Sequence, residues 1–238
     1  MIKGNKTVLI TGASKGIGKE IAKSLIKNNF QVIGISRTHS IKDKNYMGFV
    51  KDLTNLKDYD KLLLEIKKKY TNIIAVISNA GSGIFKNLEN FSEKDIGEFI
   101  NLNLISHIIL SKAFINYFKR NNNGYFIFNG SEAVSKGGKK ATLYCSAKHG
   151  LLGLAKSLRL ECNNDGIRVS IINAGMVKSN FFQKLDFEPG INLENYINTK
   201  DLANLVLFLL KSNKNINYFD INLDPLKKAI KFKKNKSK

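Results

Sequence analysis

The fold is decided by the stretch Thr11-Gly12-Ala13-Ser14-Lys15-Gly16-Ile17-Gly18, which joins an apolar run to a segment with helical periodicity. Gly12 allows a tight turn, Gly16 lets the backbone approach a pyrophosphate, and Gly18 lets the helix pack closely on a sheet. Free N–H groups at the start of the helix then attract the phosphates. A glycine-rich turn alone needs no ligand, but a strand before it and a helix after it predict a dinucleotide-binding unit.

Apolar runs alternate with helical segments along the rest of the chain. We expect strands at residues 7–10, 31–36, 46–50, 73–78, 125–129, 167–173 and 217–223. We expect helices at residues 17–27, 56–70, 92–120, 142–162 and 202–210, with N-caps at Ser92 and Thr199. This alternation predicts a parallel sheet that is covered on both faces. The sequence therefore predicts one doubly wound α/β domain of the Rossmann type, in three α/β/α layers, at residues 1–226, followed by a basic tail at residues 227–238.

The composition excludes several other classes of protein. The chain has 238 residues, of which 43% are hydrophobic and 24% charged, so it can bury the core of one large domain. Two cysteines and three scattered histidines predict no disulfide framework and no metal site. The apolar runs are shorter than the roughly 18 residues of a membrane span, and the first is too short for a signal sequence. We therefore expect a cytoplasmic protein without a membrane partner.

The net charge of +20 raises the question of a nucleic-acid partner. Only four of the 39 basic residues are arginines, and lysine is spread over every segment. Nucleic-acid surfaces usually use arginine for its bidentate geometry, so this charge indicates a compositional bias and argues against a nucleic-acid partner. The alternative is a cofactor-sensing or nucleic-acid-associated binding protein on the same fold that does no chemistry. Nucleic-acid binding with a steep salt dependence, and no turnover, would identify it.

The end of the second expected strand indicates which dinucleotide binds. A site for NAD usually places an acid there to bond the ribose 2′-hydroxyl, whereas this strand ends in Gly34-Ile35-Ser36-Arg37. The guanidinium of Arg37 suits a 2′-phosphate, and Lys15 in the glycine turn adds a second positive charge. We therefore expect NADP(H), with NAD(H) as the alternative if both side chains are only solvated surface charges.

A tyrosine and a lysine share one face of the expected helix at residues 142–162. Tyr144 and Lys148 are four residues apart, so their side chains project together. A free tyrosine has a pKa of about 10, and a nearby ammonium is expected to lower that pKa toward neutrality. Tyr144 is then suited to general acid–base catalysis. By itself this spacing is common, and it also fits an amphipathic helix with an exposed lysine.

Together, the glycine turn at residues 11–18, the tripeptide Asn79-Ala80-Gly81 and the Tyr144–Lys148 pair resemble the short-chain dehydrogenase/reductase family. The resemblance implies an oxidoreductase that uses NADP(H) to interconvert a carbonyl and an alcohol on a small molecule. Ser131, thirteen residues before Tyr144, would polarise the carbonyl. Asn103 would hold a water that links Lys148 to solvent. Tyr144 would be the acid and base, and Lys148 would also bind the nicotinamide ribose.

The resemblance also assigns cofactor contacts. Asp52 and Leu53 would contact the adenine, and residues 79–81 would line the groove. The motif after the sixth strand departs from the family pattern, because Ala174 replaces its proline; Val177 and Ser179 would still meet the nicotinamide amide. The full expected cofactor set is Gly12, Ser14, Lys15, Gly16, Ile17, Gly18, Arg37, Asp52, Leu53, Asn79, Ala80, Gly81, Tyr144, Lys148, Gly175, Val177 and Ser179.

The resemblance places a lid over the substrate at residues 180–198. Its apolar side chains would close a dry pocket, or else simply pack against the core: Phe181, Phe182, Leu185, Phe187, Pro189 and Ile191. The ending Asp224-Pro225-Leu226 lacks the glycine-rich form typical of 3-oxoacyl carrier-protein reductases, which favours relatives acting on small hydroxy acids or assorted carbonyls. The long helices at about residues 104–120 and 142–162 would form the interfaces of a homodimer or homotetramer.

Overall fold

Strand β1 (Thr7–Thr11) lies inside a parallel sheet, between β4 (Ile73–Ser78) and β2 (Gln31–Ser36). The structure is a computed structural model that describes residues 6–233, and within them the main sheet has seven strands in the order β10-β6-β5-β4-β1-β2-β3. The remaining strands are β3 (Tyr46–Val50), β5 (Gly124–Asn129), β6 (Ile167–Ala174) and β10 (Asp220–Leu223). The strand order reverses between β1 and β4, which is where sheets of this kind bind ligands.

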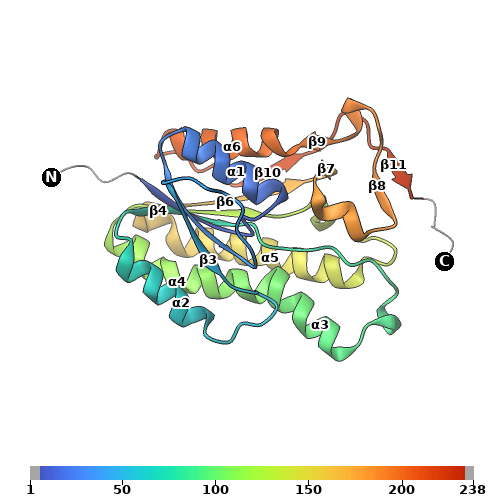
Figure 1. Cartoon of the computed structure of the whole chain (residues 1–238), viewed down its shortest axis with the longest axis horizontal. Helices are drawn as coiled ribbons and strands as arrows, with labels where there is room; N and C mark the ends of the chain where they lie inside the picture. The colour runs from blue at the N-terminus through green and yellow to red at the C-terminus, as the bar shows by residue number, and fades with distance from the viewer. Residues whose placement is uncertain (1–5, 234–238) are drawn as a thin grey trace.

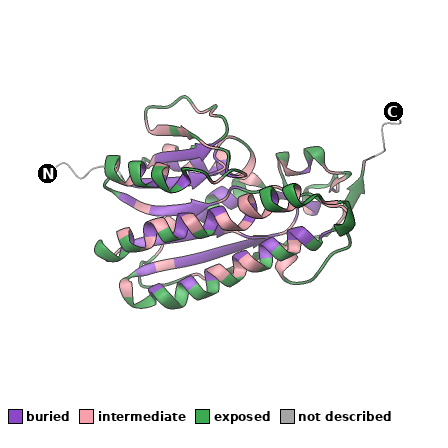
Figure 2. Ribbon diagram, turned by 90° about the horizontal axis from the view of Figure 1, so that it is seen from below, coloured by how far each residue is buried: buried purple, intermediate pink, exposed green. Residues whose placement is uncertain are grey.

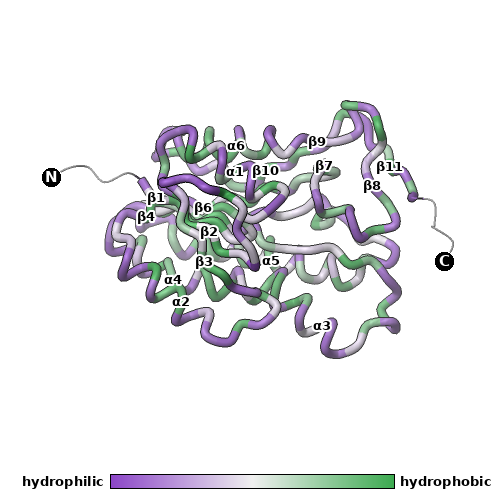
Figure 3. Tube along the Cα trace, viewed as in Figure 1, coloured by the Kyte–Doolittle hydropathy of each residue, from purple (hydrophilic) through white to green (hydrophobic). Residues whose placement is uncertain are grey.

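Helices cover both faces of the sheet, as Figure 1 shows. Helices α1 (Gly16–Lys27) and α6 (Thr199–Lys211) lie on one face, and α2 (Tyr59–Lys69), α4 (Ser106–Arg120) and α5 (Thr142–Cys162) lie on the other. Successive strand residues face opposite layers: Val8 and Ile10 pack with α1 and α6, and Leu9 packs with the other layer. Strands β1, β2, β4, β5 and β6 are accordingly buried and apolar along most of their length, whereas the edge strands β3 and β10 are partly exposed (Figures 2 and 3). The three-layer Rossmann-type fold is therefore confirmed.

Most element bounds agree with the prediction, and the differences have local causes. Helix α2 begins at Tyr59 because Asp58 adopts a left-handed conformation with φ of 58°. Helix α6 is capped by Asn198, in a capping box with Asp201, so the expected cap at Thr199 is wrong. Strand β10 begins only at Asp220, because the Asn217 side chain bonds both backbone groups of Val169 and replaces the ladder there.

The expected helix at residues 92–120 is three segments. Ser92 caps α3 (Glu93–Ile100) with the expected Asp95 capping box, a π-helical turn spans Asn101–Ile105, and α4 follows. Single π-turns inside α-helices often occur at functional sites. By length and composition the stretch Glu93–Arg120 could cross a membrane. Its α4 part instead packs against the sheet, with Leu110, Phe114 and Phe118 buried, as expected for a core helix.

Two small sheets lie outside the predicted elements. Strand β7 (Val177–Lys178) pairs with β9 (Ile197–Asn198), and β8 (Phe187–Pro189) pairs antiparallel with β11 (Ile230–Phe232). Part of the expected basic tail thus lies beside the expected lid, at one end of the molecule (Figure 1). Residues 1–5 and 234–238 lie outside the described residues. Short 3-10 helices complete the chain at Leu88–Asn90, Glu132–Val134, Asn163–Asp165, Asn180–Lys184 and Leu193–Asn195.

Candidate active site

The glycine turn leaves its backbone accessible at the start of α1. Gly12 and Gly16 have positive φ angles of +73° and +56°, which favour glycine. A Cβ on Gly18 would lie 2.3 Å from the Gly12 carbonyl oxygen, so the close approach of α1 to the turn also needs glycine. No side chain caps α1 among the described residues, and its first N–H groups keep their capacity for an anion. This cradle fits a pyrophosphate.

We predict that Gly18→Ala lowers NADPH affinity by at least about tenfold, because the methyl group must displace the Gly12 carbonyl or the Asn79 side chain. The unfolding temperature should fall as well. Gly153→Ala is the control, since that α5 glycine has no neighbour within 4 Å of a Cβ. Cofactor titration and thermal unfolding of both variants test this. Wild-type affinity in Gly18→Ala would show that the turn does not hold the phosphates.

Asn79 and Ala80 join strand β4 to the glycine turn. The Thr11 Oγ1 atom accepts hydrogen bonds from the backbone N–H groups of Asn79 and Ala80, at 3.0 and 3.1 Å. The Asn79 side-chain amide donates to the Thr11 carbonyl oxygen at 3.0 Å. Gly81 follows at the surface. These bonds fix the two strand ends on either side of the point where the strand order reverses.

Several polar groups lie in the part of the expected cofactor site that would hold the adenosine. The Ser40 hydroxyl donates to the Ser14 carbonyl at 3.3 Å, so the loop after β2 lies beside the glycine turn. Lys15 and Arg37 are both exposed, one on each of these segments. Although partial burial opposes it, hydrogen bonds from Thr54 and the charge of Arg37 lower the pKa of Asp52. Leu53 packs in the core instead, with its side chain away from solvent.

Ser131 and Tyr144 meet at the carboxyl end of β5. Ser131 caps the short helix Glu132–Val134, where its Oγ accepts a hydrogen bond from the N–H of Ala133 at 3.2 Å. Tyr144 is 8% exposed near the start of α5. Burial raises the pKa of Tyr144 to about 12, against the opposing effect of its hydrogen bond with Ser131. The expectation that a neighbouring ammonium lowers this pKa is therefore wrong.

Lys148 does not lower the pKa of Tyr144, because its ammonium bonds another group. Its Nζ lies 5.9 Å from the centre of the Tyr144 ring and donates to the Asn129 carbonyl at 3.0 Å. The side chain of Asn129 in turn donates to Asn79. Burial lowers the pKa of Lys148 to about 8. Among the described residues it has no carboxylate partner, so two of its N–H donors suit oxygen acceptors such as ribose hydroxyls.

Asn103 lies in the π-helical turn, and that turn directs its side chain toward the loop after β4. The amide donates to the Phe99 carbonyl at 3.0 Å, and its Oδ1 accepts from the N–H of Ser82 at 3.1 Å. A Cβ on Gly81 would lie 3.0 Å from this Oδ1 and 3.9 Å from the Lys148 Nζ. Asn103 and Lys148 therefore approach the same exposed glycine.

Aromatic rings surround Tyr144. The ring centres of Phe85, Phe181 and Phe99 lie 5.2, 6.0 and 6.5 Å from its own. These rings form an aromatic wall beside Tyr144. Phe187 in β8 extends this aromatic wall, since its ring centre lies 5.2 Å from that of Phe85. Of the expected lid residues, Ile191 is 75% exposed and does not take part. The sequence patterns do not single out Phe85 or Phe99, although Phe85 is only four residues after Gly81 and its position near the expected cofactor site could be predicted from that.

The remaining expected residues lie on the loops after β6. Val177 is buried in β7, and Ser179 caps the next short helix by accepting from the N–H of Phe181. Gly175 is fixed by the hydrogen bond from its N–H to the Leu223 carbonyl at 2.8 Å. A Cβ on Gly16 would lie 3.6 Å from the Cβ of Ser179, so this loop lies directly beside the glycine turn.

Known proteins share both the sequence and this architecture. Residues 6–189 match the short chain dehydrogenase family. A 3-oxoacyl-[acyl-carrier-protein] reductase of Buchnera aphidicola is 35% identical over 217 residues, which cover 86% of this chain and 89% of that protein. A sepiapterin reductase of Chlorobaculum tepidum is 26% identical and covers 76% of this chain and 81% of its own. An alcohol dehydrogenase of Thermococcus sibiricus, solved with 5-hydroxy-NADP, has a TM-score of 0.82 at 25% identity and covers 94% of this chain and 98% of that one.

Proposed function

The chain belongs to the short-chain dehydrogenase family of oxidoreductases, and on that premise we propose that it interconverts a carbonyl and an alcohol on a small molecule with NADP(H). The observation that carries the proposal is the pairing of Ser131 with Tyr144, with the Lys148 ammonium 5.9 Å from the Tyr144 ring centre and without a carboxylate partner among the described residues. The test is NADPH oxidation by the purified protein with a panel of carbonyl compounds.

Each catalytic side chain has one task in this proposal. NADPH supplies the hydride when it is bound. The Ser131 hydroxyl holds the carbonyl oxygen and stabilises its developing charge, while the Tyr144 hydroxyl gives that oxygen a proton. Lys148 binds ribose hydroxyls, and Asn103 holds a water through which protons reach Lys148. The aromatic wall excludes water from the reacting atoms. Because Tyr144 keeps its proton near neutral pH, it is in the form that donates a proton during reduction.

The preference for NADP(H) rests on Lys15 and Arg37, which are exposed on two neighbouring segments. We predict that Arg37→Ala weakens NADPH binding by about tenfold to a hundredfold, since a charge-assisted bidentate contact contributes roughly 1.5–3 kcal/mol. NADH affinity should change by less than about threefold, because NADH lacks the 2′-phosphate. Arg120→Ala is the control, because Arg120 is an exposed arginine at the end of α4 and its loss removes the same charge away from the glycine turn. Fluorescence titration measures both cofactors, and equal NADPH losses in the two variants would contradict a specific contact.

Two substrate classes come first in the panel. The relatives include several 3-oxoacyl-[acyl-carrier-protein] reductases, which favours 3-oxoacyl thioesters. The ending Asp224-Pro225-Leu226 favours small oxo acids and other carbonyls instead. Turnover of a substrate from either class supports the proposed oxidoreductase activity. No turnover with any carbonyl, together with salt-sensitive nucleic-acid binding, would favour the non-catalytic alternative.

We further propose a cytoplasmic homodimer or homotetramer that contacts itself through α4 and α5. Both helices expose apolar side chains beyond the face that packs on the sheet, such as Ile108 and Leu160. Exposed apolar surface on a long helix is typical of a contact between subunits. Small-molecule substrates are its expected partners, and neither a membrane nor a nucleic acid is part of the proposal.

A further inference from the structure

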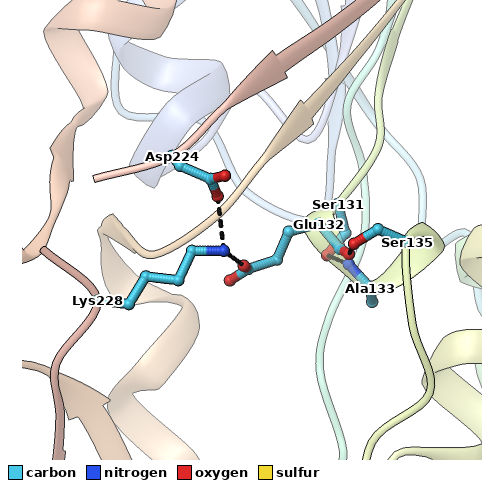
Figure 4. Close-up of polar contacts among 6 residues, drawn as sticks. All are labelled: Ser131, Glu132, Ala133, Ser135, Asp224 and Lys228. Carbon is cyan, nitrogen blue, oxygen red and sulfur yellow. Dashed lines mark hydrogen bonds and ion pairs between the residues drawn. The ribbon is translucent and has the colours of Figure 1, made fainter. Parts of the chain in front are cut away.

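Three charged side chains form a network at the edge of the site. The Lys228 Nζ lies 2.6 Å from Glu132 Oε2 and 2.8 Å from Asp224 Oδ1, as Figure 4 shows. Glu132 directly follows Ser131, and the carboxylate of Asp224 follows strand β10. The two acids come from segments 92 residues apart, and Lys228 bridges them.

The network connects the carboxyl ends of three neighbouring strands. Strands β5, β6 and β10 are adjacent in the sheet, and Glu132, Gly175 and Asp224 follow them. A Cβ on Gly175 would lie 3.1 Å from Asp224 Oδ1 and 3.3 Å from the Glu132 carboxyl carbon. The loop after β6 is thus held between the two acids that Lys228 joins.

The same segment also reaches the lid. Two residues after Lys228 the chain enters β11, which pairs with β8. The N–H of Gly190 donates to the Ala229 carbonyl at 2.8 Å, at the end of this pairing. Phe187 in β8 contacts Phe85, and Phe85 contacts Tyr144. The short segment at residues 228–232 therefore connects the turn that carries Ser131 with the aromatic wall.

We propose that Lys228 is a positioning residue, which holds the Ser131 turn through Glu132 and anchors β11 against the lid strand β8. This inference rests on the proposed carbonyl reduction. Lys228 acts by geometry, since it fixes the turn that carries the Ser131 hydroxyl. It also acts by charge, because it neutralises the carboxylate of Glu132 near Tyr144. The other titratable groups that face Tyr144 are Cys145 and Lys148 from α5; its neighbours Phe85, Phe99 and Phe181 are uncharged.

The test compares Lys228→Gln with Lys228→Arg and with Lys227→Gln. Lys227 is the matched control, because it is in the same segment and pairs with Glu194 at 3.0 Å without touching Glu132. We expect Lys228→Gln to lower kcat by about threefold to tenfold, with NADPH affinity within about twofold of wild type, and Lys228→Arg to restore kcat. The pH profile of alcohol oxidation should move upward by roughly half a unit, because an uncompensated Glu132 opposes the phenolate.

Hydrogen exchange supplies a readout that does not need turnover. Lys228→Gln should accelerate exchange at the N–H of Ala133, which bonds Ser131, and at the N–H of Gly190, whereas Lys227→Gln should not. Unchanged exchange and kinetics in Lys228→Gln, or equal changes in the control, would overturn the inference. A wild-type protein without turnover on any carbonyl would overturn the proposed function instead, and exchange would still decide whether Lys228 anchors these segments.

Discussion

Tyr144→Phe is expected to lower carbonyl reduction by about three orders of magnitude and to leave NADPH binding within about twofold. The substitution removes only the hydroxyl that delivers the proton. The phenylalanine ring keeps the contacts with Phe85, Phe99 and Phe181, so the wall around the site should stay intact. Steady-state kinetics and cofactor titration on the same preparation separate the two effects.

Tyr59→Phe is the matched control for this experiment. Tyr59 is a fully buried tyrosine in α2, and its hydroxyl has no hydrogen-bond partner among the described residues. Its loss should therefore leave turnover unchanged and cost no stability. Turnover of Tyr144→Phe close to that of Tyr59→Phe would contradict the assignment of Tyr144 as the proton donor.

The pH dependence of the wild type follows from the same two buried groups. With a pKa of about 12, Tyr144 stays protonated through neutral pH, so reduction should be nearly constant there. Lys148, with a pKa of about 8, loses its charge as the pH rises further, and reduction should begin to decline. Alcohol oxidation needs the phenolate and should rise with pH over the same range.

The sequence predicts what local patterns encode. The turn at residues 11–18 and the alternating segments indicate the sheet, because apolar periodicity and glycine geometry act over a few residues. The Tyr144–Lys148 spacing is local in the same way, whereas Ser131 and Asn103 are assigned to the candidate site by the family resemblance. The pKa of Tyr144 could not be predicted in this way, since its burial depends on Phe85 and Phe181 from distant parts of the chain. The position of Lys148 four residues after Tyr144 therefore led to the wrong prediction for this pKa.

Short strand pairings between distant segments could not be predicted either, because they leave little pattern in the local sequence. Strand β11 is three residues long and lies in a lysine-rich stretch, so its composition indicated a solvated tail. Its pairing with β8 depends on contacts across some 40 residues of chain, which no periodicity reveals. The π-helical turn around Asn103 is hidden similarly, because its residues have ordinary helical periodicity.

Acid is expected to destabilise the protein through His107, which is buried in α4 beneath the site. The Ser78 hydroxyl lies 2.5 Å from its Nδ1. Burial lowers the pKa of His107 to about 3, and the positive charge of Lys148 acts in the same direction. Between this pKa and the unfolded value of about 6.5, only the unfolded chain binds the proton. The free energy of unfolding therefore falls as the pH falls from about 6.5 toward 3, by about 5 kcal/mol over the whole window.

Urea unfolding of His107→Gln at about pH 7 and about pH 4 isolates this effect, because the carboxylates titrate alike in both proteins. The variant should lose less stability on acidification than wild type, even though it starts lower after losing a well-packed imidazole. His149→Gln changes an exposed histidine of α5 and should keep the wild-type slope. Equal slopes in all three proteins would mean that His107 is protonated without cost. Burial and the positive charge of Lys148 both keep the His107 imidazole neutral, so the lysine proposed to bind hydroxyl groups also contributes to the acid sensitivity of the fold.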